Sequence, residues 1–492
     1  MSSTMFPSSA VGLSYNLDYK LPPSMAENSR MYSVSVAPDG LTSVSGSQAI
    51  ALFAANTSPV NPFNSQIISF TIPSGNSRSV YMDPRDTYLS FRLTVTVTTA
   101  SAVTNAVNPQ IIGSAQSFFD QLNLISNNVP LETINQYGIL ANMLLNATVS
   151  QSERNGAIAV GMGADSDSQN GTNLYRDTLA TGSYYFNFCI PLLSVIGLNG
   201  GDKLFPIGSI SNLQLQMTTA SIFPMVSFCT AAATAGAATV TLDQFSLNMK
   251  YIDIGSAQAL VDSTLPDGKI FIKSQTWVTA NANIPNGSGG QVNAFYQIRN
   301  SSVKSLIFQN SQATSAATLN GYYDAINYGV TQWNATINGL SYPQTPLNPS
   351  GRPGQCMLAF LSALGLQGDY KKITGTINRT CYGATLPSLT GLGNVDTMLV
   401  VPAAGVRNVS AIESTVNNSL VTSPNFHYLG IDTEKNSGVL FQGLNTRASG
   451  VQGNYFISTT GGLTSAVTSF CFGLVDCVLL VDHASQTIQA FV

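Results

Sequence analysis

Two segments of this chain follow the same plan, and their repetition constrains the architecture more than any other feature. The first covers residues 118–130 and the second residues 332–343. Each contains an alternating strand, then an Asn-Asn or Asn-Gly pair, then a proline. Such pairs tolerate the positive φ of a tight hairpin turn. The matching glutamines, Gln121 and Gln332, are 332 − 121 = 211 residues apart, close to half of the 492-residue chain. Two copies of one β-fold are the simplest interpretation.

An apolar helical pattern follows each hairpin, and further alternating segments predict strands on both sides of it. The helices are predicted over 131–145 and 356–364. The other predicted strands open with two whose alternation is typical of one buried face, 66–72 and 87–97. The rest are 184–190, 213–217, 240–252, 271–278, 303–308, 454–457 and 470–482.

The order of elements in the second half repeats that of the first. We match 271–278 to 66–72, 303–308 to 87–97, and 470–482 to 240–252. The run 470–482 is almost continuously apolar, which indicates a strand buried on both faces.

These matches divide the chain into two β-domains with a segment on either side of the first. We predict an N-terminal arm over 1–60, a first jelly roll over 61–255, a junction over 256–270 and a second jelly roll over 271–492. The expected fold class is all-β, with two consecutive eight-stranded jelly rolls and short helices between strands. A propeller would need a period of roughly 40–50 residues, which the sequence lacks. The weakly periodic stretch 365–423 predicts a functional excursion from the domain or a tower-like insertion.

The chain is unusually poor in charged residues. Only 9% are Asp, Glu, Lys or Arg, against about 25% in an ordinary soluble protein. A surface of this kind favours an assembling protein, with an ordinary extracellular β-sandwich as the alternative. The net charge of −4 offers no basic field for a nucleic-acid backbone, and the first 60 residues carry only Lys20 and Arg30 as cations. We therefore expect no direct sequence-specific binding of nucleic acid.

The six cysteines have no CxxC spacing and lie mostly in apolar segments, so we expect reduced structural thiols. The N-terminus lacks the basic start and apolar core of a signal peptide, and no apolar run approaches the roughly 18–20 residues of a membrane span. We expect a chain that is made and folded in a cytosol.

Residues that could support catalysis or metal binding are few. His427 and His483 are the only histidines, and both are expected to be structural. The segment 165–176 approaches a calcium loop, but its glycine, Gly171, falls one place late and Arg176 stands where a bidentate Glu is needed. We expect a flexible polar loop there.

A pair of carboxylates raises the question of glycoside hydrolysis. Asp476 and Asp482 share a face of one strand by their even spacing. No aromatic platform accompanies them. We therefore predict no catalytic, cofactor-binding or metal-binding residues, no cofactor, and a protein that is not an enzyme. The helical run 134–145 contains no Lys or Arg, so it is expected to cap the core and not to bind a membrane surface.

Short motifs in both halves point to a known family. They are Phe-Cys-Ile-Pro-Leu-Leu at 188–193, Leu-Phe-Pro-Ile-Gly at 204–208, and the C-terminal runs 441–446 and 472–482. In this order they resemble the double-jelly-roll major capsid proteins of the PRD1/adenovirus lineage, especially those of small double-stranded DNA viruses (virophage- and polinton-like). The resemblance covers residues 61–492 by order of elements, while identity is concentrated in the motifs.

The resemblance implies a structural role in a virion. It implies a homotrimer whose six jelly rolls form a pseudo-hexameric capsomer, tiled into an icosahedral shell around a genome or an internal membrane. The partners it implies are neighbouring capsomers, a penton protein, and minor or cement proteins. One alternative is a secreted or surface β-sandwich that binds or hydrolyses carbohydrate. Another is a penton or spike protein of the same fold.

Overall fold

A computed structural model describes the parts of the chain that build its sheets. The described residues are 29–48, 65–75, 77–99, 108–112, 114–148, 171–173, 182–200, 204–220, 225–228, 237–264, 269–312, 325, 329–349, 352–366, 427–434, 442–457, 463 and 466–491. The predicted insertion at 365–423 lies outside them except for its first two residues. So does the calcium-like segment, apart from the three residues of strand β8 (Gly171–Asn173).

The first half of the chain forms two main antiparallel sheets. One has the order β1-β12-β4-β9, with β2 (Ser43–Gln48) added on β12, and the other has the order β3-β10-β6-β7. The eight principal strands are β1 (Arg30–Val36), β3 (Ile67–Ile72), β4 (Val80–Thr99), β6 (Phe119–Ser126), β7 (Val129–Asn135), β9 (Gly182–Pro191), β10 (Leu213–Thr219) and β12 (Ala237–Asp253). A small third sheet contains β11 (Met225–Phe228), β5 (Asn108–Ile112) and β8.

The second half repeats this arrangement. Its sheets have the orders β13-β20-β15-β18, with β21 (Thr487–Phe491) added on β20, and β14-β19-β16-β17. The principal strands are β13 (Lys269–Ile284), β14 (Gly290–Tyr296), β15 (Val303–Gln312), β16 (Val330–Ile337), β17 (Leu340–Leu347), β18 (Tyr428–Asp432), β19 (Val451–Ile457) and β20 (Val467–Asp482).

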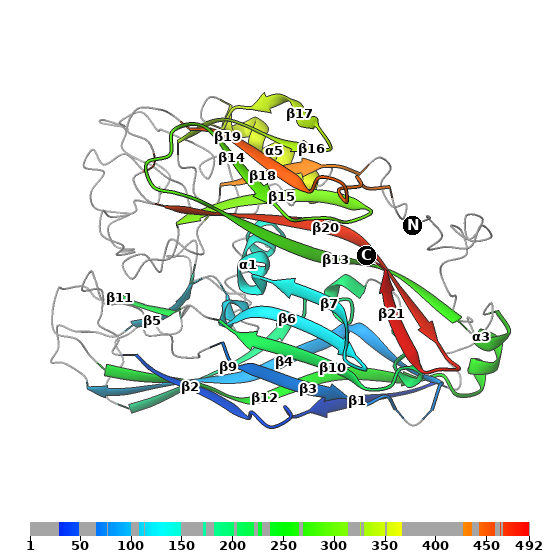
Figure 1. The fold of residues 1–492 in the computed structure, drawn as a ribbon. Helices are drawn as coiled ribbons and strands as arrows, with labels where there is room; N and C mark the ends of the chain where they lie inside the picture. The colour runs from blue at the N-terminus through cyan, green and yellow to red at the C-terminus, as the bar shows by residue number, and fades with distance from the viewer. Residues whose placement is uncertain are drawn as a thin grey trace, which may run out of the picture.

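Both halves have the strand order of a jelly roll. When the eight principal strands of each half are numbered along the chain, both halves pair them as 1-8-3-6 and 2-7-4-5. The predicted all-β fold with two eight-stranded jelly rolls is confirmed. In Figure 1 the first jelly roll forms the lower part of the molecule and the second the upper part. The last strand of the first ends at Asp253 and the first strand of the second begins at Lys269, with a short helix α3 (Gln258–Thr264) between them.

The repeated hairpin is confirmed at atomic detail. Strands β6 and β16 begin at residues 119 and 330, which are again 330 − 119 = 211 apart. Asn127 and Asn128 have φ of 48° and 64°, and Asn338 and Gly339 have φ of 51° and 77°. Two successive positive φ values match the right-handed twist of the flanking strands, so both loops close with only two residues.

The helix after the first hairpin begins later than predicted. Residues 129–135 form strand β7 and the helix α1 spans Tyr137–Thr148, so the expected start at Leu131 is wrong. A register shift between Leu124 and Ile125 of the partner strand leaves both Leu131 and Glu132 buried, and this break in alternation imitates helical spacing. The second helix, α5, spans Pro353–Ala363 and begins three residues before its predicted start, with a proline in its first turn.

The expected N-terminal arm is too long at its C-terminal end. Arg30–Val36 forms β1, which pairs along its whole length with β12. Serines on one side of β1 and a half-exposed other side hid its alternation. Because β1 and β13 both stand first in their jelly rolls, the match of 271–278 to 66–72 is also wrong: strand β3 corresponds to β14. The other two matches, of β15 to β4 and of β20 to β12, are confirmed.

The cores lie between the two sheets of each jelly roll. In the first, Phe91 contacts the rings of Phe118, Phe119, Phe188 and Phe245. In the second, Phe308 packs edge-on against Tyr296 and Trp333. Within α1, no described side chain before Thr148 is exposed, as expected for a helix that caps a core. Among the described residues, no helix is long and apolar enough to cross a membrane.

Strand β18 lies unusually close to helix α5, and one glycine makes this approach possible. A Cβ added at Gly430 would lie 2.6 Å from the Cα of Phe360 and 3.0 Å from the Cβ of Ala363. The neighbouring rings of Phe360 and Tyr428 stack with centroids 5.0 Å apart. The packing of helix on strand therefore depends on the absence of a side chain at this position.

We predict that Gly430→Ala lowers the free energy of unfolding by about 1–3 kcal/mol, because the helix must move away from the strand to admit the methyl group. Chemical denaturation monitored by tryptophan fluorescence would measure the change. The matched control is Gly354→Ala in α5, where an added Cβ meets nothing within 4 Å. Equal stability of the Gly430 variant and the wild type would contradict this account of the contact.

Candidate functional site: buried polar clusters and the interface between the jelly rolls

The two jelly rolls meet along a continuous interface inside the chain. Strand β13 of the second lies against β7 and against the loop that follows β9 in the first (Figure 1). Three side-chain hydrogen bonds cross from β13: Thr276 Oγ1 to Glu132 Oε1 at 2.5 Å, Ser274 Oγ to the Asn199 carbonyl at 2.8 Å, and Thr279 Oγ1 to the Asn135 carbonyl at 3.0 Å. The turn after β20 adds a contact in which Ser211 N donates to the Gln486 carbonyl at 3.1 Å.

Glu132 is the buried acid at the centre of this interface. Glu132 is only 4% exposed. Oε2 accepts hydrogen bonds from the Ser194 hydroxyl at 2.5 Å and the Val195 amide at 3.0 Å, while Oε1 accepts one from Thr276. Burial raises the pKa of Glu132, and these three hydrogen bonds oppose the rise. The carboxyl group thus joins a loop and two strands from both jelly rolls.

The two histidines are also buried. His483, in the turn after β20, brings Nδ1 into hydrogen-bond contact with Ser209 Oγ of the first jelly roll. Burial lowers the pKa of both rings, that of His427 to about 4. Both rings are therefore neutral near pH 7. The position of His483 in the interface could not be foreseen, because only the folded chain brings residues 274 positions apart together.

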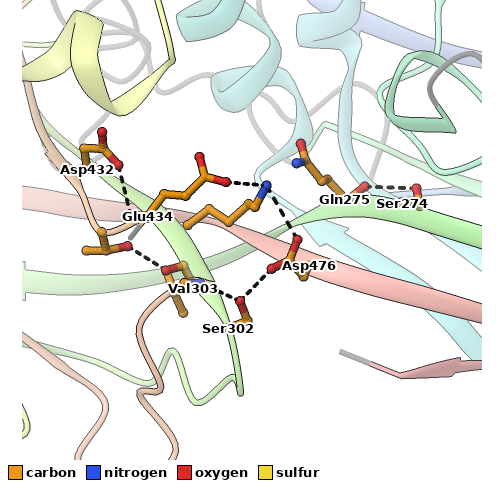
Figure 2. A network of polar contacts seen from close by, with 10 residues as sticks. Ser274, Gln275, Ser302, Val303, Asp432, Glu434 and Asp476 are labelled. Carbon is orange, nitrogen blue, oxygen red and sulfur yellow. Dashed lines mark hydrogen bonds and ion pairs between the residues drawn. The ribbon is translucent and has the colours of Figure 1, made fainter. Parts of the chain in front are cut away.

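A second polar cluster surrounds Lys304 inside the second jelly roll. Its ammonium nitrogen lies 2.8 Å from Glu434 Oε1 and 3.7 Å from Asp476 Oδ1. Ser302 Oγ donates to Asp476 Oδ2 at 2.6 Å. Figure 2 shows Glu434 and Asp476 directed toward the same ammonium group, with Ser302 beside Asp476. The Thr433 hydroxyl binds the Val303 carbonyl at 2.6 Å, so the cluster joins the segment after β18 to β15 and β20.

The two aspartates that share one face of β20 have separate structural roles. Asp476 is 1% exposed and ion-paired. Asp482 accepts the backbone amides of Ala484 and Ser485 in the turn after β20. Six residues along a strand separate them by about 20 Å, whereas the carboxyl pair of a glycosidase lies within about 10 Å. The structure does not bring them together.

The described cysteines behave as predicted. Cys356, Cys471 and Cys477 are buried free thiols, and Cys189 is a half-buried one. Burial raises the pKa of Cys356 and of Cys477 to about 12. Cys229 and Cys381 lie outside the described residues. Within the described part of the chain, no group of three or more His, Cys, Asp or Glu side chains could hold a metal ion.

We predict that Lys304→Ala lowers the free energy of unfolding by about 3–5 kcal/mol, because it leaves two carboxylates without their buried counter-ion. Urea denaturation would measure the loss. The control is Lys250→Ala, which removes an exposed pair with Asp86 at 2.7 Å and should leave the midpoint almost unchanged. A similar effect of both substitutions would show that the Lys304 cluster contributes no more than a surface pair.

We predict that Glu132 makes stability depend on pH in an identifiable direction. Its folded-state pKa lies above the ordinary 4.5, so between these two values the folded chain binds more protons than the unfolded one. The contribution to stability is complete below pH 4.5 and decreases as the pH rises through the folded-state pKa. Glu132→Gln removes this titration and can still accept the Val195 amide.

The difference in unfolding free energy between Glu132→Gln and wild type should therefore grow in favour of the variant from pH 4.5 to pH 8. Urea denaturation over this range measures it. Glu132→Ala serves as a control, because it leaves the donors without a partner and should destabilise at every pH. A difference that does not change with pH would contradict the assignment of a raised pKa to Glu132.

Comparison with known proteins places this fold. No family model and no curated protein matches the sequence. Among solved structures, a chain of the Sputnik virophage aligns with a TM-score of 0.53 and 10% identity over 95% of this chain and 88% of that one. A chain of the PBCV-1 virus capsid gives 0.52 and 10% over 94% and 96%. The mavirus major capsid protein gives 0.50 and 11% over 100% and 95%.

At this level of identity the likeness is one of fold. It extends over nearly the whole of each chain, so both jelly rolls and their order are shared. The chain therefore has the double jelly-roll fold of viral major capsid proteins such as that of mavirus.

Proposed function

We propose that this chain is a viral major capsid protein with a structural, non-catalytic role in the virion. The observation that carries the proposal is the presence of two jelly rolls of identical strand order in one chain, held together by a buried interface. Solved structures of the same fold that align over nearly their full length are capsid chains, which supports the same role here.

The duplicated fold suits a homotrimer with a pseudo-hexameric outline. Three copies of a two-domain chain supply six similar units, so a nearly sixfold capsomer forms from one kind of chain. Such capsomers tile an icosahedral shell by lateral contacts. The low content of charged residues, 9%, supports contacts that are mainly uncharged and that depend little on salt.

The remaining partners follow from this role. Capsomers of this type would contact neighbouring capsomers, a penton protein and minor or cement proteins, with an internal membrane as a further surface. The residues before β1 would form the arm that ties under neighbours. The net charge of −4 supports an inner surface that does not grip nucleic acid by its phosphates.

The alternative of a carbohydrate-binding or carbohydrate-hydrolysing β-sandwich has less support. A hydrolase would use Asp476 and Asp482, but Asp476 is buried in an ion pair with Lys304. A buried, ion-paired carboxylate cannot reach a sugar without breaking that cluster. The capsid role requires no such change.

We predict that the purified chain elutes as a species of three times its 51.9 kDa mass, or as larger shells and sheets. Size exclusion coupled to light scattering measures the mass, and negative-stain electron microscopy would show pseudo-hexagonal particles. Because few charges are available to pair, the mass should be unchanged from low salt to 1 M NaCl.

Two outcomes would contradict the proposal. A clean monomer at all concentrations, stabilised by glycans, would favour the carbohydrate-binding alternative. Dissociation of the trimer at moderate salt would show that its contacts are mainly ionic.

A further inference from the structure

The outer face of the sheet that contains β1 is exposed, whereas the equivalent face of the sheet that contains β13 is buried. Strands β1 and β13 occupy the same edge position, and their terminal residues Arg30 and Lys269 lie opposite Asp253 and Asp482. Counting from these ends, Met31, Ser33 and Ser35 correspond to Ile270, Ile272 and Ser274. The first three are exposed, Met31 at 66%, whereas the second three are buried, and Ser274 donates to the Asn199 carbonyl of the first jelly roll.

The neighbouring strands show the same difference. The outer side of β20, with Cys477, Leu479 and Val481, is fully buried. Its counterpart on β12, with Asn248, Lys250 and Ile252, is only half-buried. We call the outer side of β1, β12, β4 and β9 the open face. It also carries two exposed tyrosines, Tyr88 at 40% and Tyr185 at 58%.

Strand β7 of the first jelly roll contacts the second jelly roll within the chain. The corresponding strand of the second jelly roll, β17, and the helix α5 after it have exposed side chains. In the first, β7 supplies Glu132, which lies opposite Leu124 and contacts β13. In the second, Tyr342 of β17 lies opposite Ala335, and 335 − 124 = 211, so Tyr342 holds the register position of Glu132. Helix α5 exposes Leu358 at 47%, whereas α1 exposes no described side chain before its last residue.

The chemistry of the two surfaces is compatible. The charged groups of the open face are already paired within the chain, Arg92 with Asp243 at 2.8 Å and Lys250 with Asp86 at 2.7 Å. Serine and asparagine side chains fill the space between them. Strand β17 contains no charged residue. Because the charges of the open face are already paired, the uncharged strand β17 can cover this face and leave no buried charge without a counter-ion.

We propose that the open face is the site at which a second copy of this chain binds, through β17 and the exposed side of α5. The contact between copies then repeats the contact between jelly rolls within one copy. Such a contact joins different surfaces of the two copies, so it forms a ring when the rotation closes. The proposal rests on the proposed capsomer for a ring of three copies.

The strand registers of the two jelly rolls predict which residues of neighbouring copies should lie side by side. Within the chain, Glu132 accepts a hydrogen bond from Thr276 of β13, and two residues earlier on the same strand Ser274 lies opposite Cys477 of β20. Asn248 corresponds to Cys477 and Tyr342 to Glu132. The proposal therefore places Asn248 of one copy beside Tyr342 of the next.

The first test introduces a charge on the open face. Met31→Glu should weaken association at least about tenfold, because covering β1 would bury an unpaired carboxylate. Light scattering over a concentration series measures the change. The matched control is Phe295→Glu, on β14 outside both surfaces, where the wild-type ring is 63% exposed and no change in mass is expected. Both positions are exposed, so neither substitution should prevent folding.

The second test is a covalent link between copies. In a Cys189→Ser background, Asn248→Cys combined with Tyr342→Cys should give linked dimers and trimers on oxidation, resolved on a non-reducing gel. Asn248→Cys combined with Gln291→Cys, and each single variant, should give none.

The outcomes separate the two proposals. In one outcome, Met31→Glu leaves the trimer intact and oxidation does not link the Asn248→Cys and Tyr342→Cys positions. This outcome would leave the proposed trimeric capsomer standing and would overturn the proposed interface. A wild-type chain that stays monomeric at every concentration would overturn both. Weakened association together with a specific link would support both.

Discussion

Strand β20 is almost continuously apolar and is buried on both sides, and much of the molecule is organised by the need to cover it. A strand with two buried faces needs a layer on each. The opposing sheet of its own jelly roll covers one face, and the first jelly roll covers the other. An isolated second jelly roll would lose the contacts that Ser274 and Thr276 of β13 make with the first. The two β-domains are therefore parts of one packed unit.

Polar groups placed within these apolar surfaces determine how they fit together. Apolar side chains alone would let the sheets slide with little change in free energy, whereas a buried acid with three donors has one satisfactory position. Glu132 fixes β13 against β7 in this way. The Lys304 cluster does the same between β15, β20 and the segment after β18. Their contribution is to the specificity of the arrangement.

The parts of the fold that the sequence predicted are those governed by local chemistry. The two-residue turns at Asn127 and Asn338 require positive φ, and the residue types that allow it are few. The continuous apolar run of β20 identified a strand buried on both sides. By contrast, β1 is half-exposed along one side, and its serines gave no clear pattern.

The interface was beyond sequence reasoning for a different reason. A lone Glu at the start of a predicted helix has the pattern of a surface residue, and only long-range packing makes Glu132 a buried acceptor for Thr276. The same holds for His483 and Ser209, which lie 274 positions apart. The start of α1 was misplaced because the register shift in the hairpin put two consecutive buried residues, Leu131 and Glu132, into β7.

The pairing of the first and last strands of each jelly roll has a consequence for synthesis on the ribosome. In the first jelly roll, Arg30 pairs with Asp253. This sheet cannot close until more than two hundred residues have been made, and such long-range pairing is slow. The first jelly roll that this closure completes also contains β7 and the loop after β9, which contact β13 of the second. The first jelly roll is thus made before the second, so the almost continuously apolar strand β20 emerges when the first jelly roll is already available to pack against its sheet.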